Sequence, residues 1–353
     1  MTGIGGLHVV HEVQSYLGAL GFHEQPFAPT ADPTYFYSTR ENKSCLYRLW
    51  SNIDERHGIA VVLGNYGTGK TTLLRKLMTG MAAEPKLYNT AVVGSPIPSW
   101  TSFSLLEAIV KQFGLRPSTR SFAAYMESLN QYLLANRHRI STLIIDDAQN
   151  LNKRGQLELL RLVQNLETSQ HKLLNLVLFA QLEWEHVLRA APNFAQRINM
   201  TYTLPPLRIE EIQAFIEFRM AQASTQRRRV KFDENALRII HAYSEGNPRL
   251  VVTTCRNALL LAARMGSATI TGDIVLHTIE KTTLHDPKKH ARAKTANVQP
   301  AFTLKDAKSP LSKVRATQFS RRDVPAMTAS RSRDRRANEM LLRAARTKTR
   351  SRG

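Results

Sequence analysis

The chain has 353 residues, and 42% of them are hydrophobic, which is enough for one large globular domain or for two domains with a tail. Its two cysteines are far apart and form no CxxC motif, which excludes a disulfide framework and a cysteine-based zinc site and suits a reducing compartment. The formal net charge is +21 and is unevenly distributed: residues 281–353 carry 20 Lys and Arg against 5 Asp and Glu, and the preceding residues carry 29 against 23. A basic segment of this kind attracts polyanions, most often nucleic acid and less often an anionic membrane.

The N-terminal segment has neither a basic start nor a long apolar stretch, so it does not resemble a signal peptide. No apolar run approaches the ~18 residues of a membrane-spanning helix. We therefore expect a cytoplasmic protein with no membrane partner.

Strand and helix patterns alternate in the middle of the sequence, after an N-terminal segment of another kind. Residues 1–57 are predicted to form an arm rich in aromatic residues and prolines, followed by a helix. The following domain, 58–207, contains short apolar runs without clean alternation, which is typical of parallel strands buried on both faces; these runs are 59–64, 90–94, 142–146 and 174–180. Helical patterns lie between them, at 70–80, 102–113, 121–135 and 154–168. The alternation predicts an α/β domain built on a doubly wound parallel sheet.

The remaining sequence lacks predicted strands. Helical patterns at 208–222, 233–244 and 248–265, with another beginning at Gly272, predict a small all-helical lid domain over 208–284. Residues 285–353 are basic, rich in Ser, Thr and Ala and poor in aromatic residues, which predicts a disordered tail.

The segment GNYGTGKT matches the phosphate-binding P-loop pattern G-x-x-x-x-G-K-[ST]. Its glycines allow backbone amides to approach phosphate oxygens, and the helix that follows directs its positive dipole end toward them. Lys70 is predicted to reach the β- and γ-phosphates, and Thr71 to offer a hydroxyl group to Mg²⁺. An ordinary glycine-rich turn is the alternative, but the preceding apolar run and the following helical pattern favour a nucleotide site. The predicted ATP-binding residues are Gly64, Asn65, Tyr66, Gly67, Thr68, Gly69, Lys70, Thr71 and Thr72.

The segment TLIIDDAQNL supplies the carboxylates that such a site needs. Asp146, at the end of a buried strand, is expected to hold Mg²⁺ and so to join the ATP-binding set. Asp147 is expected to orient or deprotonate the attacking water. The alternative is a solvated turn after a strand.

Six ordered blocks within residues 20–280 resemble AAA+ ATPases of the ExeA/TniB/TnsC type, most closely the TnsC-like transposition regulators. They include GNYGTGKTTLLRKL, LIIDDAQNL, NLVLFAQLEWEHVL, FAQRINMTYTLPPL and EGNPRLV. The resemblance implies that Gln181 is a polar sensor at the end of the fourth strand and that Arg197 is an arginine finger for a neighbouring subunit. It also implies that Arg249 senses the γ-phosphate, whereas taken alone both arginines could simply be solvated. The implied catalytic set is thus Lys70, Asp147, Gln181 and Arg197.

Two positions depart from the family pattern. The family usually has Glu where this chain has Asp147, which is one methylene shorter, so we expect slow hydrolysis. Residues 180–182 read Ala-Gln-Leu in place of the more usual Gly-Gln-Pro, which affects the role of Gln181.

The TnsC-like branch encloses duplex DNA through two segments that correspond here to 95–102 and 116–121. The resemblance therefore implies backbone contacts to double-stranded DNA, because guanidinium and hydroxyl groups donate to phosphate oxygens without reading the base sequence. Ordinary polar loops are the alternative. The predicted contacts are Trp100, Thr101, Arg116, Thr119 and Arg120.

The motifs, the resemblance and the basic segment together favour an ATP-dependent, DNA-binding regulator of transposition. Such a protein assembles on DNA as a homo-oligomeric ring or helical filament, hexameric per turn, links a target-site selection protein to a transposase, and is reset by ATP hydrolysis. The alternatives are another AAA+ DNA remodeller, such as a helicase loader or phage replication factor, a nucleotide-gated scaffold, and an ExeA-like secretion ATPase. The last is the least favoured, because such relatives carry a membrane span and a cell-wall-binding region after the ATPase, and neither is expected in this sequence. The expected cofactors are ATP and Mg²⁺.

Overall fold

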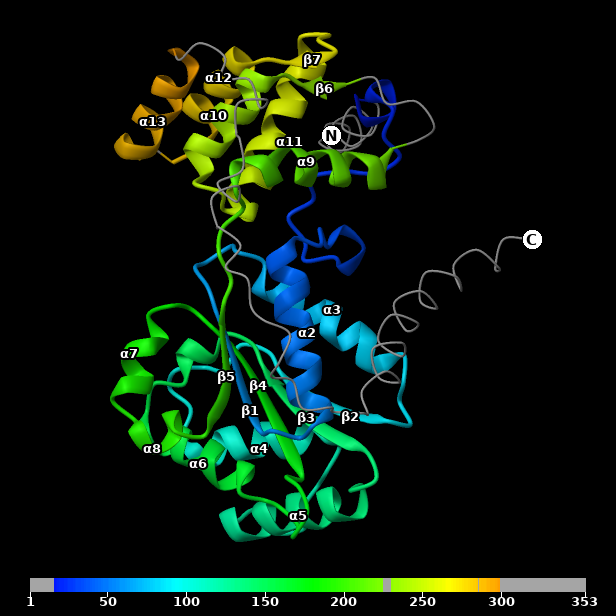
Figure 1. The fold of residues 1–353 in the computed structure, drawn as a ribbon, viewed down its shortest axis with the longest axis vertical. Coiled ribbons are helices and arrows are strands. Elements are labelled where there is room, and N and C mark those ends of the chain that lie inside the picture. The colour runs from blue at the N-terminus through cyan, green and yellow to red at the C-terminus, as the bar shows by residue number, and fades with distance from the viewer. Residues whose placement is uncertain (1–15, 225–229, 285, 299–353) are drawn as a thin grey trace, which may run out of the picture. The chain divides into compact units, whose positions relative to one another are not determined.

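A computed structural model describes residues 16–224, 230–284 and 286–298 (Figure 1). Its α/β part is built on a five-stranded parallel sheet in the order β2–β3–β4–β1–β5. The strands are β1 Ile59–Leu63, β2 Tyr88–Val93, β3 Ile140–Ile145, β4 Leu174–Ala180 and β5 Ile198–Thr203. The predicted parallel α/β sheet is confirmed.

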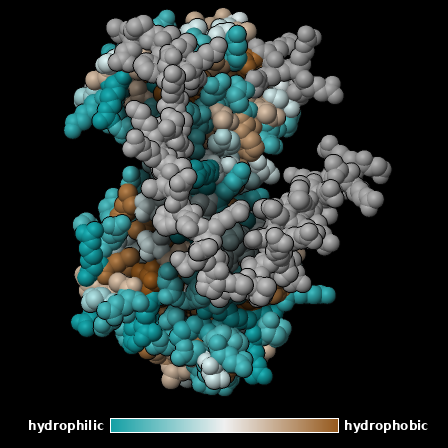
Figure 2. All heavy atoms as spheres, viewed as in Figure 1, coloured by the Kyte–Doolittle hydropathy of each residue, from teal (hydrophilic) through white to brown (hydrophobic). Residues whose placement is uncertain are grey.

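Helices cover both faces of this sheet, as a doubly wound fold requires. Alternate residues of β1 face opposite sides: Ala60 and Val62 pack with α2 and α3, whereas Val61 and Leu63 pack with α4, α5 and α6. The bounds are α2 Arg40–Asp54, α3 Lys70–Ala82, α4 Ser102–Gln112, α5 Phe122–Ala135 and α6 Arg154–Gln164. On the face shown in Figure 2, the described surface of the α/β part is mostly hydrophilic, with hydrophobic residues visible beside α7.

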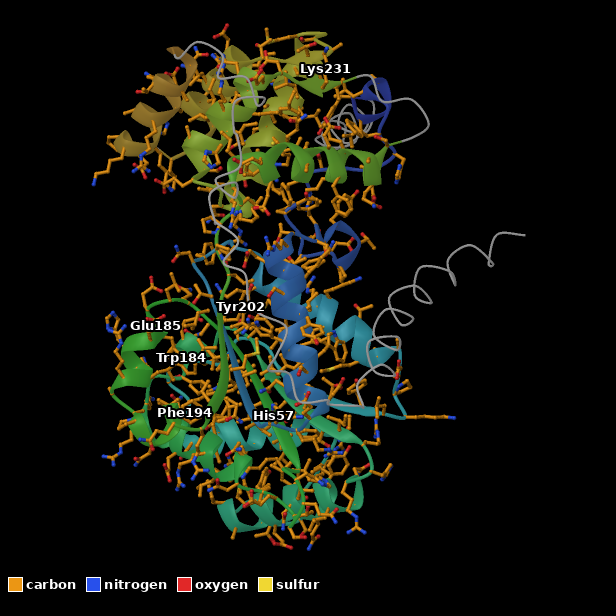
Figure 3. The ribbon with its side chains drawn as sticks, in the orientation of Figure 1. His57, Trp184, Glu185, Phe194, Tyr202 and Lys231 are labelled. Atoms are coloured by element: carbon orange, nitrogen blue, oxygen red, sulfur yellow. The ribbon has the colours of Figure 1, made fainter. Side chains whose placement is uncertain are left out.

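Two short helices, α7 (Trp184–Arg189) and α8 (Pro192–Ala195), connect β4 to β5. Their aromatic residues, Trp184 and Phe194, meet with ring centroids 6.4 Å apart (Figure 3). Trp184 Nε1 also donates a hydrogen bond to the Leu151 carbonyl at 3.0 Å. This packing fixes the chain directly after Gln181, at the carboxyl end of β4.

The second part is mainly helical. Its elements are α9 Ile209–Ala223, β6 Lys231–Phe232, α10 Glu234–Ser244, α11 Pro248–Arg264, β7 Thr269–Ile270, α12 Gly272–Thr282 and α13 Pro287–Val298. Two features differ from the sequence-based expectation. The part is not all-helical, because β6 and β7 form a short parallel pair. Helix α13 lies where a disordered tail was predicted; the rest of that tail, 299–353, lies outside the described residues.

Helix α13 packs through an alanine and a histidine instead of a stripe of large apolar residues, so its sequence lacks the usual helical pattern. Ala293 and His290 are buried, and the His290 ring meets Tyr243 of α10 at 5.8 Å between centroids. Lys294 forms a 2.9 Å ion pair with Glu280 of α12. None of the described helices combines the length and apolar character needed to cross a membrane.

Candidate nucleotide site

The loop between β1 and α3 has the backbone geometry of a phosphate cradle. Gly67 and Gly69 have φ angles of +82° and +95°, a region that disfavours residues with a Cβ. Helix α3 begins at Lys70 without a side-chain cap, so the amide groups of its first turn remain available to an anion. The Gly64 N–H donates to the Ala180 carbonyl at 3.2 Å, which ties the loop to the end of β4.

The Lys70 ammonium group is held inside this loop. Its Nζ donates to the carbonyl oxygens of Gly64 at 2.7 Å and of Asn65 at 3.0 Å, and the residue is only 8% exposed. Burial lowers the pKa of Lys70, and the nearby Asp146 carboxylate partly offsets that effect. The site therefore contains a buried cation whose hydrogen bonds go to neutral carbonyls, which suits it to an anionic ligand.

Thr71 and Asp146 meet at the start of α3. Thr71 Oγ1 donates to Asp146 Oδ2 at 2.9 Å, and burial raises the pKa of Asp146. A hydroxyl and a carboxylate oxygen are the hard donors that Mg²⁺ prefers, and Mg²⁺ commonly takes only one or two protein ligands beside phosphates and water. The pair therefore fits this ion. Among the described residues, no group of three or more His, Cys, Asp and Glu residues has the arrangement of a metal site.

Asp147 follows in a left-handed conformation, with φ +51°. Both of its carboxylate oxygens accept hydrogen bonds: Oδ2 from Ser95 Oγ at 2.7 Å, and Oδ1 from Gln149 Nε2 at 3.0 Å. Gln149 Oε1 in turn accepts from the Gln181 N–H at 3.2 Å. The structure thus links the two predicted catalytic residues through Gln149. Sequence reasoning did not single out Ser95 or Gln149.

The N-terminus of α11 contacts the tip of the P-loop. The Arg249 guanidinium lies 4.5 Å from the Tyr66 ring centroid, and the backbone N–H of Arg249 donates to the Gly67 carbonyl at 3.3 Å. Asn247 Nδ2 donates to the Tyr66 carbonyl at 2.6 Å. A Cβ on Gly67 would lie 2.5 Å from Asn247 Oδ1. The helical part is therefore in direct contact with the phosphate loop, and Asn247 is a contact that the sequence analysis missed.

The P-loop borders a cavity of about 390 Å³, a volume within the usual range for small-molecule sites. It brings together the predicted residues Tyr66–Thr72, Asp147, Gln181 and Arg249. The cavity is also lined by the N-terminal arm, residues 28–32 and 35–37, and by α9. The arm was predicted to pack against the domain, but not to form a wall of this site.

Arg197 lies away from the cavity. It precedes Ile198, which pairs with Ile59 at the amino end of β1, whereas the P-loop follows the carboxyl end of that strand. Five strand residues span roughly 16 Å. Arg197 Nη1 is hydrogen-bonded to Asn165 Oδ1 at 2.6 Å. The arginine-finger prediction therefore requires a neighbouring subunit and stays a prediction.

Arg120 of the second predicted DNA segment lies with its guanidinium over the ring of Phe103, which directly follows the first segment, at 5.5 Å. Three of the five predicted contacts have partners within the chain. Arg120 forms a two-pronged ion pair with Glu107 at 2.7 and 3.0 Å, Thr101 caps α4, and Trp100 packs against the core. Arg116 and Thr119 are exposed. DNA contact by these segments stays a prediction.

Comparison with known proteins matches residues 53–188 to the family described as "AAA domain". A curated relative, general secretion pathway protein A of Aeromonas hydrophila, is 34% identical over 277 residues, covering 77% of this chain and 49% of the relative. The chain therefore spans about half the length of that protein.

Solved structures show the same fold at low sequence identity. The ORC2 protein of Aeropyrum pernix, solved as ADPNP–ADP complexes, has a TM-score of 0.59 at 19% identity and covers 75% of this chain and 74% of its own. The ORC1 protein of the same organism, solved in complex with DNA, has a TM-score of 0.55 at 19% identity over 74% of this chain and 70% of its own. Residues 53–188 thus match an AAA domain, and the parallel sheet with its P-loop has the AAA fold, in agreement with the geometry around Lys70 and Asp146.

Proposed function

We propose that this protein couples ATP binding and hydrolysis to a movement of its helical part against its α/β part, as the ATPase of a general secretion pathway. The observation that carries the coupling is the contact of Arg249 and Asn247 with the P-loop residues Tyr66 and Gly67. Any ligand that reshapes the loop must change these contacts. The pathway comes from the curated relative, of which the chain spans about half.

The residues divide the work of hydrolysis as follows. The loop amides and Lys70 bind the triphosphate, and Thr71 and Asp146 would hold Mg²⁺, which supplies charge neutralisation at the phosphates. Asp147, fixed by Ser95 and Gln149, orients the attacking water and takes its proton. Arg249 leaves the Tyr66 ring for the γ-phosphate and returns after hydrolysis, so that the helical part reports the state of the nucleotide.

A second candidate is an ATP-dependent DNA-binding regulator, including a regulator of transposition with transposase and target-site partners. Residues 281–353 favour it, because they carry 20 Lys and Arg against 5 Asp and Glu. Two of these basic residues, Lys288 and Arg292, are exposed on α13. The neighbour solved with DNA shares only the fold at 19% identity. The secretion relative is the more similar in sequence, so the first proposal is preferred.

Steady-state ATP hydrolysis with and without duplex DNA separates these proposals. We expect Mg²⁺-dependent hydrolysis that is lost in Lys70→Ala and changes less than about twofold with DNA, because the site is complete apart from Arg197. DNA stimulation of about tenfold or more, together with ATP-dependent rings or filaments on DNA in electron micrographs, would support the second candidate instead. No hydrolysis at any protein concentration, with or without DNA, would contradict both.

A further inference from the structure

Helix α9 carries a buried arginine that the proposed chemistry does not use. Arg219 is only 6% exposed, although it lines the nucleotide cavity. Its guanidinium lies over the Tyr35 ring at 4.7 Å and near the Phe215 ring at 5.8 Å. Burial is the main influence on the pKa of Arg219 and lowers it. A buried guanidinium without a close acid is costly, so its hydrogen bonds indicate what it is kept for.

Those hydrogen bonds all go to the N-terminal arm. Arg219 Nε donates to the Pro26 carbonyl at 2.9 Å, and Nη2 donates to the Ala28 carbonyl at 3.0 Å. The arm is also attached at the end of α9, where the His23 N–H donates to the Ala223 carbonyl at 2.9 Å. The first half of the arm is therefore fixed to the helical part.

The other end of the arm is fixed to the α/β part. Arg75 of α3 donates from Nη1 to the Ala31 carbonyl at 2.8 Å. Helix α3 is the helix that begins with Lys70 and Thr71, so the arm connects α9 to the phosphate-binding helix. Two arginines, one from each part, thus hold the main chain of 26–31 from opposite ends.

The segment between these anchors is a wall of the cavity. Residues 28–32 and the aromatic residues Tyr35, Phe36 and Tyr37 line it, together with Phe215 and Arg219 on one face of α9. This wall presents main chain and aromatic rings, whereas Lys70 and Thr71, which are assigned to the triphosphate and its Mg²⁺, are at the P-loop. Main-chain groups and rings suit a flat, uncharged ligand group better than they suit phosphate.

We propose that Arg219 is a positioning residue that anchors the arm as the wall for the base and ribose of the nucleotide. ATP affinity then depends on this anchor, whereas affinity for the triphosphate group alone does not. The inference rests on the proposed binding of ATP in this cavity. It also assigns a purpose to the arm, whose loss of order would open one side of the site.

The test compares two ligands in three full-length variants. Equilibrium binding of ATP and of inorganic tripolyphosphate, both with Mg²⁺, is measured for Arg219→Met, Arg75→Met and the control Arg189→Met. Arg189 is an exposed arginine in an ion pair with Glu185, and neither residue lines the cavity. We expect Arg219→Met to weaken ATP binding about tenfold and Arg75→Met about threefold, with tripolyphosphate affinity within about twofold of wild type. The control should match wild type for both ligands.

An equal loss of ATP and tripolyphosphate affinity in Arg219→Met would overturn the proposal, because it would indicate a phosphate ligand or a general defect. Unchanged ATP affinity in that variant would overturn it as well. If Arg219→Met fails to fold by circular dichroism, Arg75→Met decides alone, because that side chain is exposed. A wild-type protein that binds neither ligand would instead contradict the proposed function itself.

Discussion

Thr71 Oγ1 and Asp146 Oδ2 lie 2.9 Å apart, although 75 positions separate the two residues in the sequence. The hydrogen bond joins the first turn of α3 to the carboxyl end of β3. It places the two predicted Mg²⁺ ligands side by side, and the account of hydrolysis depends on this pairing.

Replacing Thr71 with Ala should remove most of the effect of Mg²⁺ on ATP binding, because one of two protein oxygens is lost. We expect ATP turnover to fall about 100-fold, while affinity for ATP in EDTA is nearly unchanged. Thr79→Ala is the matched control, since Thr79 is an exposed threonine on the same helix that bonds only to the Arg75 carbonyl. Equal responses to Mg²⁺ in Thr71→Ala and wild type would contradict the assignment.

Asp147→Asn should lower kcat by about 10²–10⁴-fold, because the residue could no longer accept a proton from water. ATP affinity should change little, since the neutral variant keeps the length of the side chain. Asp147→Glu adds the methylene group that the family usually has at this position and is expected to raise turnover. A wild-type rate in Asp147→Asn would exclude the role in water activation, and a small effect of Asp147→Glu would count against the expectation of slow hydrolysis.

Mixing two inactive variants tests whether Arg197 acts on a neighbouring subunit. Arg197→Ala keeps an intact nucleotide site, and Asp147→Asn keeps an intact Arg197. If Arg197 acts between subunits, the mixture should recover a substantial fraction of wild-type ATP hydrolysis, because some sites then combine the intact halves. If the activity stays at the weighted average of the two separate variants at every mixing ratio, Arg197 does not act on the nucleotide of a neighbouring subunit.

The stability of the nucleotide-free protein should depend on the charge of Asp146. Burial raises the pKa of this carboxyl above its ordinary value of 3.8, so its stabilising contribution is complete below 3.8 and is lost as pH rises through the folded-state pKa. At pH 7 the ionised group therefore costs stability. Asp146→Asn should raise the unfolding temperature at pH 7, by roughly 2–4 °C for each kcal/mol relieved, and the difference should shrink toward pH 4. A lower unfolding temperature for Asp146→Asn at pH 7 would contradict this.

The parts of the site that could be predicted are those written in local patterns. The P-loop is one continuous segment, and strands buried on both faces, such as Ile140–Ile145, form apolar runs. Strand β5 was not identified as a run, because it is an edge strand whose residues alternate between half-buried and exposed. Helix α13 was missed because alanines and a buried histidine carry its packing.

The contacts that could not be predicted depend on tertiary structure or on main-chain groups. Arg219 binds the carbonyls of Pro26 and Ala28, and any residue supplies a carbonyl, so no sequence pattern marks the partners. Gln149 reaches Asp147 and Gln181 only because β3 and β4 are neighbours in the sheet. The predicted DNA contact Arg120 has an acidic partner, Glu107, that lies thirteen positions before it in the sequence.

The most direct test of the central claim is equilibrium binding of ATP to wild type, Lys70→Ala and the control Lys76→Ala, with Mg²⁺ and with EDTA. Lys76 is exposed on the same helix and lies outside the cavity. We predict tight Mg²⁺-assisted binding to wild type and Lys76→Ala, and a loss of about 100-fold in Lys70→Ala. Equal ATP affinity in Lys70→Ala and wild type would contradict the assignment of this loop as the nucleotide site.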